Sequence, residues 1–600
     1  MRTKLLVFIF FVFSQVILAK SDVQFLSPVP NSKYVKVSSS IILRLNSLPD
    51  KSYLKKDLIQ VTGSKSGLHE CNVTLGTDGT TIIFSPVTNF QFDEKVEVKI
   101  NSIKTKSDYS EVINYYFETE KENILPASVN VFENEFSGND NFKFKTSAPF
   151  INKKSIDLPS DFPVVNVNKS VNPGPGYVFI SNFSLAPMNT GYYLMILDNS
   201  GSPVFYKKLD TAAYDFKKQP NGNLTYFSGK ALKFYEMNTY YQIIDSFACG
   251  NGYSTDLHDL RVYPNGHSLL MSYDPQRVNM AELTPRGDPN AIVIGLVIQE
   301  LDENKNVIFQ WRSWDHFNIL DATHENFTLP VIDCVHGNSI EMCKDGNILI
   351  SSRHLDEVTK INRNTGSIIW RLGGIRNQFR FENETVTFSH QHAVRELPNG
   401  NITLFDNGNY PSTIVPIHEQ VPLSRAVEYK INETTKIATL VWQYSQGIFG
   451  FAMGYAERLP NGNTIIGWGM GSPSVTEVDP NGEKVFEMTL PDGQVSYRAL
   501  KDSWDPLPNN GVPATYKVYQ NYPNPFNPNT TIRYDLPDQS DVKITVFNML
   551  GQNVQEVVKT NQTPGIYEYV FNGSGLTSGV YFYRIKTNTF TDTKRMVLVK

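Results

Sequence analysis

Residues 335–352 read VHGNSIEMCKDGNILISS, two short apolar runs joined by Asp345-Gly346. An Asp-Gly pair supplies the positive φ angles that a tight hairpin turn requires, so this stretch predicts two antiparallel strands. A second turn follows at Asn364-Thr365-Gly366, and then another strand-like run that ends at Trp370. Four short strands in a unit of about 40–60 residues are typical of a β-propeller blade.

The same unit recurs along the chain. Hairpin turns of the Asn-Gly type lie at Pro220-Asn221-Gly222, Pro264-Asn265-Gly266, Pro398-Asn399-Gly400 and Pro460-Asn461-Gly462. We predict six blades, at roughly 174–210, 218–248, 256–312, 334–372, 390–443 and 454–490. The predicted fold class is therefore all-β, with a six-bladed β-propeller over residues 161–505. One large sandwich is the alternative, and the regular recurrence of two turn types disfavours it.

The segments before the propeller have different patterns. Arg2 and Lys4 precede the apolar run 5–13, and Ala19 offers a cleavage point, so residues 1–19 predict a secretory signal peptide. Residues 20–120 alternate apolar and polar runs at intervals that favour an Ig-like β-sandwich. Residues 121–160 are polar and mixed, which indicates a linker. We expect no membrane span once the signal peptide is removed, because no second long apolar segment follows.

Composition excludes several classes of function. The net charge is −5 with both signs scattered, so no basic face for nucleic acid is expected. Four cysteines in 600 residues are too few for a disulfide scaffold. Cys334 and Cys343 flank a predicted extended strand, which separates them beyond disulfide reach. No C-x-x-C motif exists, so a thiolate zinc site is not expected.

Three histidines occupy the same place in their blades. His258, His336 and His392 each begin a strand-like run that leads into a glycine-containing turn. Because equivalent positions of neighbouring repeats lie close in space, we expect these imidazoles to converge. Arg353 follows His336 across the Asp345-Gly346 turn, and an antiparallel partner strand would return it beside that histidine.

This group has the chemistry of an anion site with a nucleophile. A guanidinium offers a fixed fork of donors, and imidazoles exchange protons near neutral pH. Three histidines also suit a metal, but an arginine among them favours sulfate, phosphate or carboxylate. We therefore predict no metal and no cofactor.

Further polar residues lie near these histidines in the sequence. Asn338 shares a strand face with His336, and His390 shares one with His392, so both are candidate substrate-binding residues. For His390 the alternatives are that it orients the nucleophile or that it caps the strand, and a cap is slightly favoured. His354 is expected to point away from Arg353 and to be structural. Asp406 and Asn407 are expected to fix a turn.

At this point a family resemblance becomes clear. Residues 335–340, 346–354, 369–374 and 391–394 with 404–408 resemble, in order, the motifs of bacterial arylsulfate sulfotransferases. The resemblance implies transfer of a sulfuryl group from a phenolic sulfate ester donor to a phenol acceptor, by a ping-pong mechanism and without a nucleotide sulfate donor. It implies that His392 becomes a sulfohistidine and that His258, His336 and Arg353 hold the sulfuryl oxygens. Whether His336 or His258 acts as general acid and base stays open.

The last module, residues 515–600, is predicted to be a small β-sandwich, and it resembles the C-terminal sorting domain of type IX secretion substrates. The N-P-F-N-P run at 524–528, the Leu550-Gly551 turn and the G-V-Y-x-Y-R strand at 579–584 carry this resemblance. It implies contact with the type IX secretion machinery and export through the periplasm to the cell surface or the medium. The competing functions are a non-catalytic surface propeller that binds a sulfated or acidic ligand, and a metal-dependent propeller hydrolase or lyase.

Overall fold

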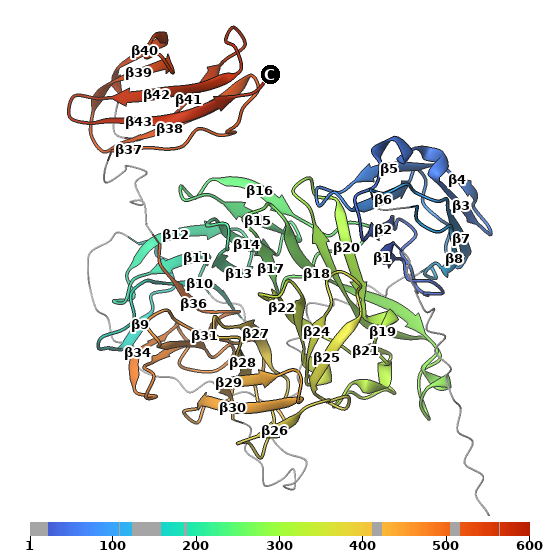
Figure 1. The fold of residues 1–600 in the computed structure, drawn as a ribbon. Helices are drawn as coiled ribbons and strands as arrows, with labels where there is room; N and C mark the ends of the chain where they lie inside the picture. The colour runs from blue at the N-terminus through green and yellow to red at the C-terminus, as the bar shows by residue number, and fades with distance from the viewer. Residues whose placement is uncertain are drawn as a thin grey trace, which may run out of the picture. The chain divides into compact units, whose positions relative to one another are not determined.

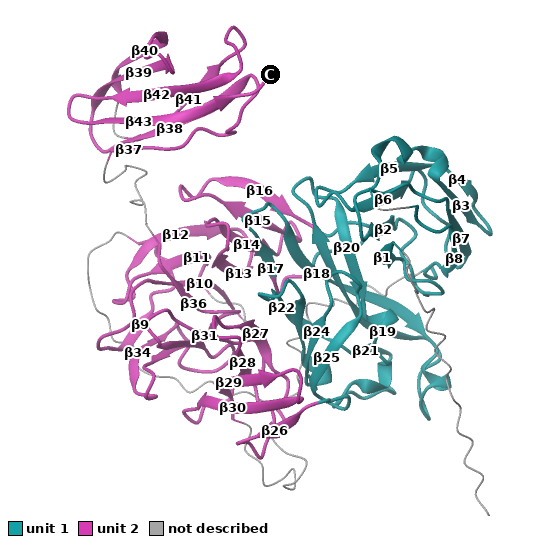
Figure 2. Cartoon of the chain, viewed as in Figure 1, with its two compact units in different colours: residues 1–130, 249–255, 260–378 teal, residues 131–248, 256–259, 379–600 magenta. Residues whose placement is uncertain are grey.

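The computed structural model describes residues 22–106, 109–122, 158–184, 189–410, 423–504, 516–562 and 565–600. The predicted signal peptide and most of the predicted linker lie outside these ranges. Two compact units make up the chain (Figure 2): unit 1 holds residues 1–130, 249–255 and 260–378, and unit 2 holds 131–248, 256–259 and 379–600. The described helices are 3-10 turns of three residues, η1 Lys51–Tyr53, η2 Lys56–Leu58, η4 Met280–Glu282, η5 Ser313–Asp315, η6 Ile319–Asp321 and η7 Arg353–Leu355. Among the described residues, no helix has the length and apolar character to cross a membrane.

The N-terminal region of unit 1 is a sandwich of two four-stranded sheets (Figure 1). One sheet has the order β1-β2-β6-β5 and the other β4-β3-β7-β8. The alternation of exposed and buried residues in β7 sends Val96, Val98 and Ile100 into the core between the sheets. The strands are β1 Val23–Ser27, β2 Ile41–Leu45, β3 Ile59–Gly63, β4 Gly67–His69, β5 Cys71–Leu75, β6 Thr81–Pro86, β7 Lys95–Ile100 and β8 Ile113–Glu118.

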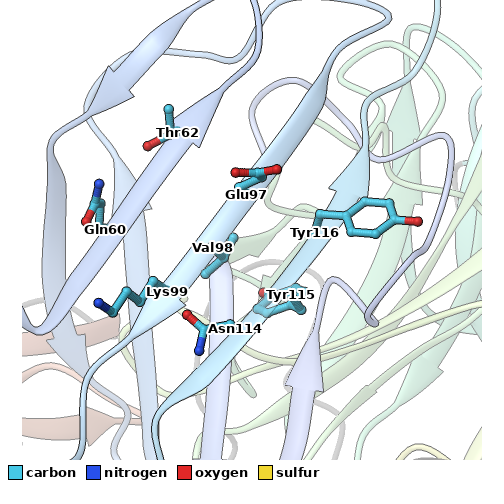
Figure 3. Close-up of a pocket in the computed structure, with 8 residues that line it drawn as sticks. All are labelled: Gln60, Thr62, Glu97, Val98, Lys99, Asn114, Tyr115 and Tyr116. Carbon is cyan, nitrogen blue, oxygen red and sulfur yellow. The ribbon is translucent and has the colours of Figure 1, made fainter.

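A groove of about 430 Å³ lies on the sheet that contains β3, β7 and β8 (Figure 3). Its lining includes Gln60, Glu97, Lys99 and Tyr116. None of the histidines or arginines predicted for the chemistry lines it. The groove therefore plays no part in the candidate site.

Six sheets of four or five strands follow, and they are the blades of a six-bladed β-propeller (Figure 1). This confirms the predicted all-β fold class. Blade 1 contains β10 Tyr177–Ser184, β11 Tyr192–Leu197 and β12 Pro203–Leu209. Blade 2 contains β13 Ala213–Lys218, β14 Leu224–Ser228, β15 Lys233–Met237 and β16 Ile243–Phe247. Blade 3 contains β17 Leu260–Val262, β18 Ser268–Val278, β19 Ala291–Leu301, β20 Val307–Arg312 and β21 Val331–Asp333. Blade 4 contains β22 Gly337–Met342, β23 Ile348–Ser352, β24 Glu357–Ile361 and β25 Ile368–Gly373. Blade 5 contains β26 Arg380–Glu382, β27 His392–Glu396, β28 Ile402–Asp406, β29 Arg425–Asn432 and β30 Ile437–Tyr444. Blade 6 contains β31 Tyr455–Arg458, β32 Thr464–Gly467, β33 Val475–Val478 and β34 Lys484–Thr489.

The hairpin turns form as their residues predict. Gly346 has a φ of +78°, and its N–H donates to the Cys343 carbonyl at 2.9 Å. The Asp345 carboxylate accepts from the Asn347 N–H at 3.0 Å. A residue with a Cβ is disfavoured at this φ, so glycine sets the turn and thereby the pairing of β22 with β23.

Chain segments from both ends of the propeller complete blades 1 and 6. The strand β9 Asn166–Ser170 pairs with β34 of blade 6. The strands β35 Gln494–Ser496 and β36 Leu500–Asp502 pair with β10 of blade 1. Each end of the domain thus adds a strand to a sheet built mainly by the other end. The added strands cover backbone edges of blades 1 and 6 that would otherwise be unpaired.

Within unit 1 the sandwich packs directly on blade 3. The Arg44 guanidinium donates to the Ile308 carbonyl at 3.0 Å, and Phe25 and Phe309 meet at 4.9 Å between ring centroids. The Lys36 ammonium lies 3.2 Å from Asp274, which is fully buried on β18. The sandwich is therefore held against blade 3 by polar and aromatic contacts.

The C-terminal module of unit 2 forms two sheets, β37-β38-β41 and β40-β39-β42-β43. Their core includes Ile532, Val542 and Tyr583. The strands are β37 Lys517–Val518, β38 Asn529–Leu536, β39 Ser540–Asn548, β40 Asn553–Gln562, β41 Gly565–Asn572, β42 Gly579–Lys586 and β43 Thr591–Leu598.

Candidate functional site

Unit 1 brings His336, Arg353 and His354 into one buried cluster. His336 precedes β22 with a left-handed φ of +50°, and a β-bulge follows between Gly337 and Ser339. Bulges of this kind re-aim side chains next to active sites. The Arg353 N–H donates to the His336 carbonyl at 2.9 Å, so the hairpin returns Arg353 beside His336 as predicted.

Asp333 holds the imidazole of His336. Its Oδ2 lies 2.6 Å from His336 Nδ1, and its position at the end of β21 is set by parallel pairing with Ile294 of β19. Burial opposes ionisation of Asp333, but the contact with His336 outweighs it and holds the pKa of the carboxyl below its ordinary value. The carboxylate therefore favours the imidazolium form of His336, which carries a second proton on Nε2.

The interpretation of His354 as pointing away from Arg353 is wrong. It assumed a strand through residue 354, but β23 ends at Ser352 and the chain turns into η7, which closes at Asp356 with a φ of +48°. Arg353 Nη1 donates to His354 Nε2 at 2.6 Å. The His354 ring also stacks on His336, with 4.7 Å between centroids. His354 therefore fixes the guanidinium that the sequence picked out.

Glu325 adds a carboxyl group to this cluster. Its Oε1 lies 3.3 Å from His354 Nδ1. Burial, followed by the negative charge of Asp333, raises the pKa of Glu325 to about 7. The group is neutral below that pH and repels a bound anion once it ionises.

Asp333, His336 and His354 place three metal-ligand atoms within 4.8 Å of one another. The hydrogen bonds disfavour an ion there. Arginine can only donate, so His354 Nε2 accepts from it and the proton of the neutral ring sits on Nδ1, facing the Asp333 carbonyl. A protonated ring nitrogen has no lone pair for a metal, and the Arg353 cation lies beside the cluster. The cluster suits an oxyanion better than a cation.

Unit 2 holds His392, the first residue of β27. Its Nδ1 lies 2.7 Å from Oδ1 of Asn407, which follows β28. The Asn407 amide nitrogen donates to the carbonyls of Gly450 at 2.7 Å and Met453 at 3.0 Å. These two acceptors fix the amide orientation, so the oxygen faces His392 and Nδ1 must donate to it. The neutral ring then carries its lone pair on Nε2.

The expectation that Asn407 only fixes a turn is therefore wrong. Asp406 does serve the turn, because its Oδ1 accepts from the N–H groups of Ser389 and Gly408, both at 3.0 Å. The chain nearby is strained at His390 and Ala393, whose φ values are +52° and +58°. Such outliers persist where surrounding contacts hold them, as at functional sites.

His258 also lies in unit 2, two residues before β17. Its Nδ1 is 2.7 Å from the Asp256 carboxylate, and its ring meets Tyr497 at 5.4 Å between centroids. His258 is 1% exposed and Asp256 2%. His258 and His336 thus each have an aspartate carboxylate on Nδ1, whereas His392 has the Asn407 amide oxygen there.

The two predicted substrate-binding residues, Asn338 and His390, lie close to the predicted catalytic histidines in the sequence. Asn338 is fully buried at the bulge of β22. The His390 ring packs on Tyr410 at 5.0 Å, and its carbonyl lies 3.2 Å from His392 Nδ1. Their contact with substrate and the convergence of the four principal residues stay predictions.

Several residues orient the predicted ones. Sequence reasoning gave Asn407 a different role and missed Asp256, Asp333 and Glu325. A short-range signal existed for two of them, because Asp256 precedes His258 by two residues and Asp333 precedes His336 by three. Asn407 and Glu325 act across loops and carry no such signal.

Comparisons with solved structures return distant matches. One is a protein of unknown function from Bacteroides caccae, at 13% identity, with a TM-score of 0.35, 55% of this chain and 99% of that chain covered. Another is the periplasmic gluconolactonase PpgL of Pseudomonas aeruginosa, at 8% identity, with a TM-score of 0.33 and the same coverage of both chains.

Comparisons with sequences are more specific. A secretion system C-terminal sorting domain matches residues 520–600, which indicates export by type IX secretion. The arylsulfate sulfotransferase AssT of Escherichia coli O6:H1 is 24% identical over 364 residues, and the match covers 47% of this chain and 58% of that protein. The model of the arylsulfotransferase (ASST) family matches residues 164–498, which is more than half of the chain and includes strands of all six blades. The chain therefore belongs to the arylsulfotransferase family.

Proposed function

We propose that this protein is an exported aryl-sulfate sulfotransferase that uses no nucleotide sulfate donor. A sulfuryl group moves from a phenolic sulfate ester to His392 and then to a phenolic acceptor. The observation that carries the proposal is the Asn407 amide, locked by two carbonyls, which leaves the lone pair of neutral His392 on Nε2. The family membership and the distant relative support the same activity.

The first half-reaction forms a sulfohistidine. His392 Nε2 attacks the sulfur, an N–S bond forms, and the S–O bond to the aryl group breaks with both electrons going to the phenolate. The Arg353 guanidinium, held by His354, supplies positive charge for the sulfuryl oxygens. His336 or His258, each with an aspartate on Nδ1, protonates the departing oxygen.

The second half-reaction reverses these steps with a different phenol. The acceptor hydroxyl gives its proton to the same histidine, its oxygen attacks the sulfur, and the N–S bond breaks. His392 returns to the neutral state, so no cofactor is consumed. Splitting the transfer in two is the basis of ping-pong kinetics.

Export is part of the proposal. The sorting domain supports passage through the periplasm and the type IX machinery to the cell surface or the medium. Small phenols and their sulfate esters would then reach the propeller from outside the cell.

The test uses full-length protein with 4-nitrophenyl sulfate and phenol, without nucleotide and with a chelator. We expect phenol-dependent release of nitrophenol, lost by at least about 10⁴-fold in His392→Ala and retained in His69→Gln, a variant of a sandwich histidine. Without phenol the proposal allows one equivalent of nitrophenol per enzyme, so continued turnover in the absence of phenol would indicate a sulfatase. No release from folded wild-type protein with several aryl donors would favour a non-catalytic propeller that binds a sulfated ligand.

A further inference from the structure

A buried ion cluster in unit 2 includes the residue that follows His258 and a residue on the same strand as His392. Its members, which we call the charge hub, are Asp215, Lys217, Asp259, Arg395 and Arg498. No side chain of the hub is more than 8% exposed. They come from β13, from the segment before β17, from β27 and from the turn between β35 and β36. None of these residues belongs to the predicted site.

Asp259 is the centre of the hub. Its Oδ2 accepts from Arg395 Nη2 at 2.8 Å, and its Oδ1 accepts from Arg498 Nη1 at 3.1 Å and from the Lys217 ammonium. Asp215 takes a second bond from Arg498 and from Lys217, both at 2.6 Å. Three basic side chains therefore share two carboxylates, which gives the hub a formal net charge of +1. Burial lowers the pKa of the Lys217 ammonium, and the two aspartates oppose that effect.

Arg395 lies on the same face of β27 as His392. Residues three apart in a regular strand face opposite sides, but β27 carries a bulge between these two positions. His392 pairs with Phe405 and Arg395 with Thr403, which are two apart on β28 and so share a face. The bulge therefore turns Arg395 to the side on which His392 is presented.

Asp259 is joined by one peptide bond to His258. The ion pair between Asp259 and Arg395 therefore connects the segment of His258 to the strand of His392. Arg498 strengthens the connection, because its guanidinium lies 5.0 Å from the ring of Tyr497, which in turn contacts His258. A buried pair with several charged hydrogen bonds holds its geometry more rigidly than apolar packing would.

We propose that Asp259 and Arg395 are positioning residues of the sulfuryl transfer, and that the hub sets the electrostatic potential at His258 and His392. The inference rests on the proposed function of those histidines. Asp256 and Tyr497 face His258, and Asn407 and the His390 carbonyl face His392. The net positive charge of the hub keeps His392 neutral and attracts the anionic donor.

The test exploits the opposite charges of the pair. Asp259→Asn removes a negative charge and so lowers the pKa of the nearby imidazoles, whereas Arg395→Met removes a positive charge and raises it. The burst is the first equivalent of nitrophenol, released as His392 takes the sulfuryl group. When its size is followed against pH, we expect the midpoint on the acid side to move by roughly one pH unit, in opposite directions in the two variants. We also expect kcat to fall about 10- to 100-fold in both variants through misplacement of the histidines.

A matched control exists in the same unit. Lys501 and Glu477 form a buried ion pair at 2.7 Å, with both side chains fully buried. Lys501→Met should lower thermal stability as the hub variants do, and leave the pH profile of the burst unchanged. A hub of merely structural importance would give the same result in all three variants.

The outcomes separate this inference from the proposed function. Histidine side-chain titrations followed by nuclear magnetic resonance report the two imidazoles even in protein without activity. Opposite shifts in the two hub variants support the inference whether or not sulfuryl transfer occurs. Unmoved titrations, or shifts in one direction, overturn it even where the wild type transfers sulfuryl groups.

Discussion

The His392 and His336 regions differ in the atom that holds the imidazole. Asn407 presents an amide oxygen to Nδ1 of His392 at 2.7 Å, and Asp333 presents a carboxylate to Nδ1 of His336 at 2.6 Å. Both fix the same tautomer of the neutral ring. Only the carboxylate also stabilises the charged ring, because opposite charges favour the protonated form. The amide thus suits a nucleophile and the carboxylate suits an acid.

Exchanging the amide for a carboxylate breaks this contrast most directly. In Asn407→Asp we expect the burst at neutral pH to fall about 100-fold, because the new charge keeps His392 protonated and removes its lone pair. Activity should recover as the pH rises and the ring loses its proton. The measurement is the nitrophenol burst across neutral and alkaline pH, with Asn407→Ala as the variant that should lose activity at every pH. A loss in Asn407→Asp that does not depend on pH would contradict the account.

The second prediction sharpens the role of the cluster around His336. Arg353→Lys keeps the charge but loses the planar fork, so we expect kcat/KM to fall roughly 30- to 100-fold. His354→Gln leaves the arginine in place without its ring support and should cost about tenfold, mainly in KM for the donor. Equal losses in both variants would show that His354 does more than orient Arg353.

The third prediction decides between the two acid candidates. Asp333→Asn and Asp256→Asn each weaken the basicity of one histidine, His336 or His258. The variant that affects the acid should lose about 10- to 50-fold with phenyl sulfate, a donor with a poor leaving group. It should lose only a few-fold with 4-nitrophenyl sulfate, whose phenolate leaves without much help. If neither variant depends on the leaving group, no histidine protonates the departing oxygen.

The smallest expected effect concerns Glu325. Its pKa of about 7 lies above the ordinary 4.5, so its neutral form stabilises the fold fully below about pH 4.5, and this contribution is lost as the pH rises through 7. The same ionisation places a negative charge near Arg353, so kcat/KM for the donor should fall a few-fold above neutral pH. Glu325→Gln should remove both dependences, measured by thermal unfolding and by steady-state kinetics. A wild-type profile that stays flat in this range would refute the assignment.

Much of the fold is readable from the sequence, because turns and strands depend on near neighbours. Asp345-Gly346 predicts a hairpin, and the hairpin places Arg353 beside His336. That placement can be predicted from these residues alone, because it depends on no other part of the chain. The error at His354 has a local cause too. Nothing in Ser352-Arg353-His354 shows that the strand stops and a 3-10 turn begins.

The orienting residues depend on distant parts of the chain. Asn407 is fixed by carbonyls 43 and 46 residues later, and Arg498 reaches Asp215 across 283 positions. No periodicity or spacing in the sequence encodes such contacts. The sequence thus indicates which residues can perform the chemistry, and the fold shows which neighbours set their protonation.

The most direct measurement is to trap the intermediate. Full-length protein is mixed with 4-nitrophenyl sulfate in the absence of phenol, quenched at alkaline pH and mapped by peptide mass spectrometry. The account predicts the added mass of one sulfuryl group on the peptide that contains His392, and its disappearance when phenol is added before the quench. A sulfuryl group on a different residue, or full transferase activity with unmodified His392, would contradict it.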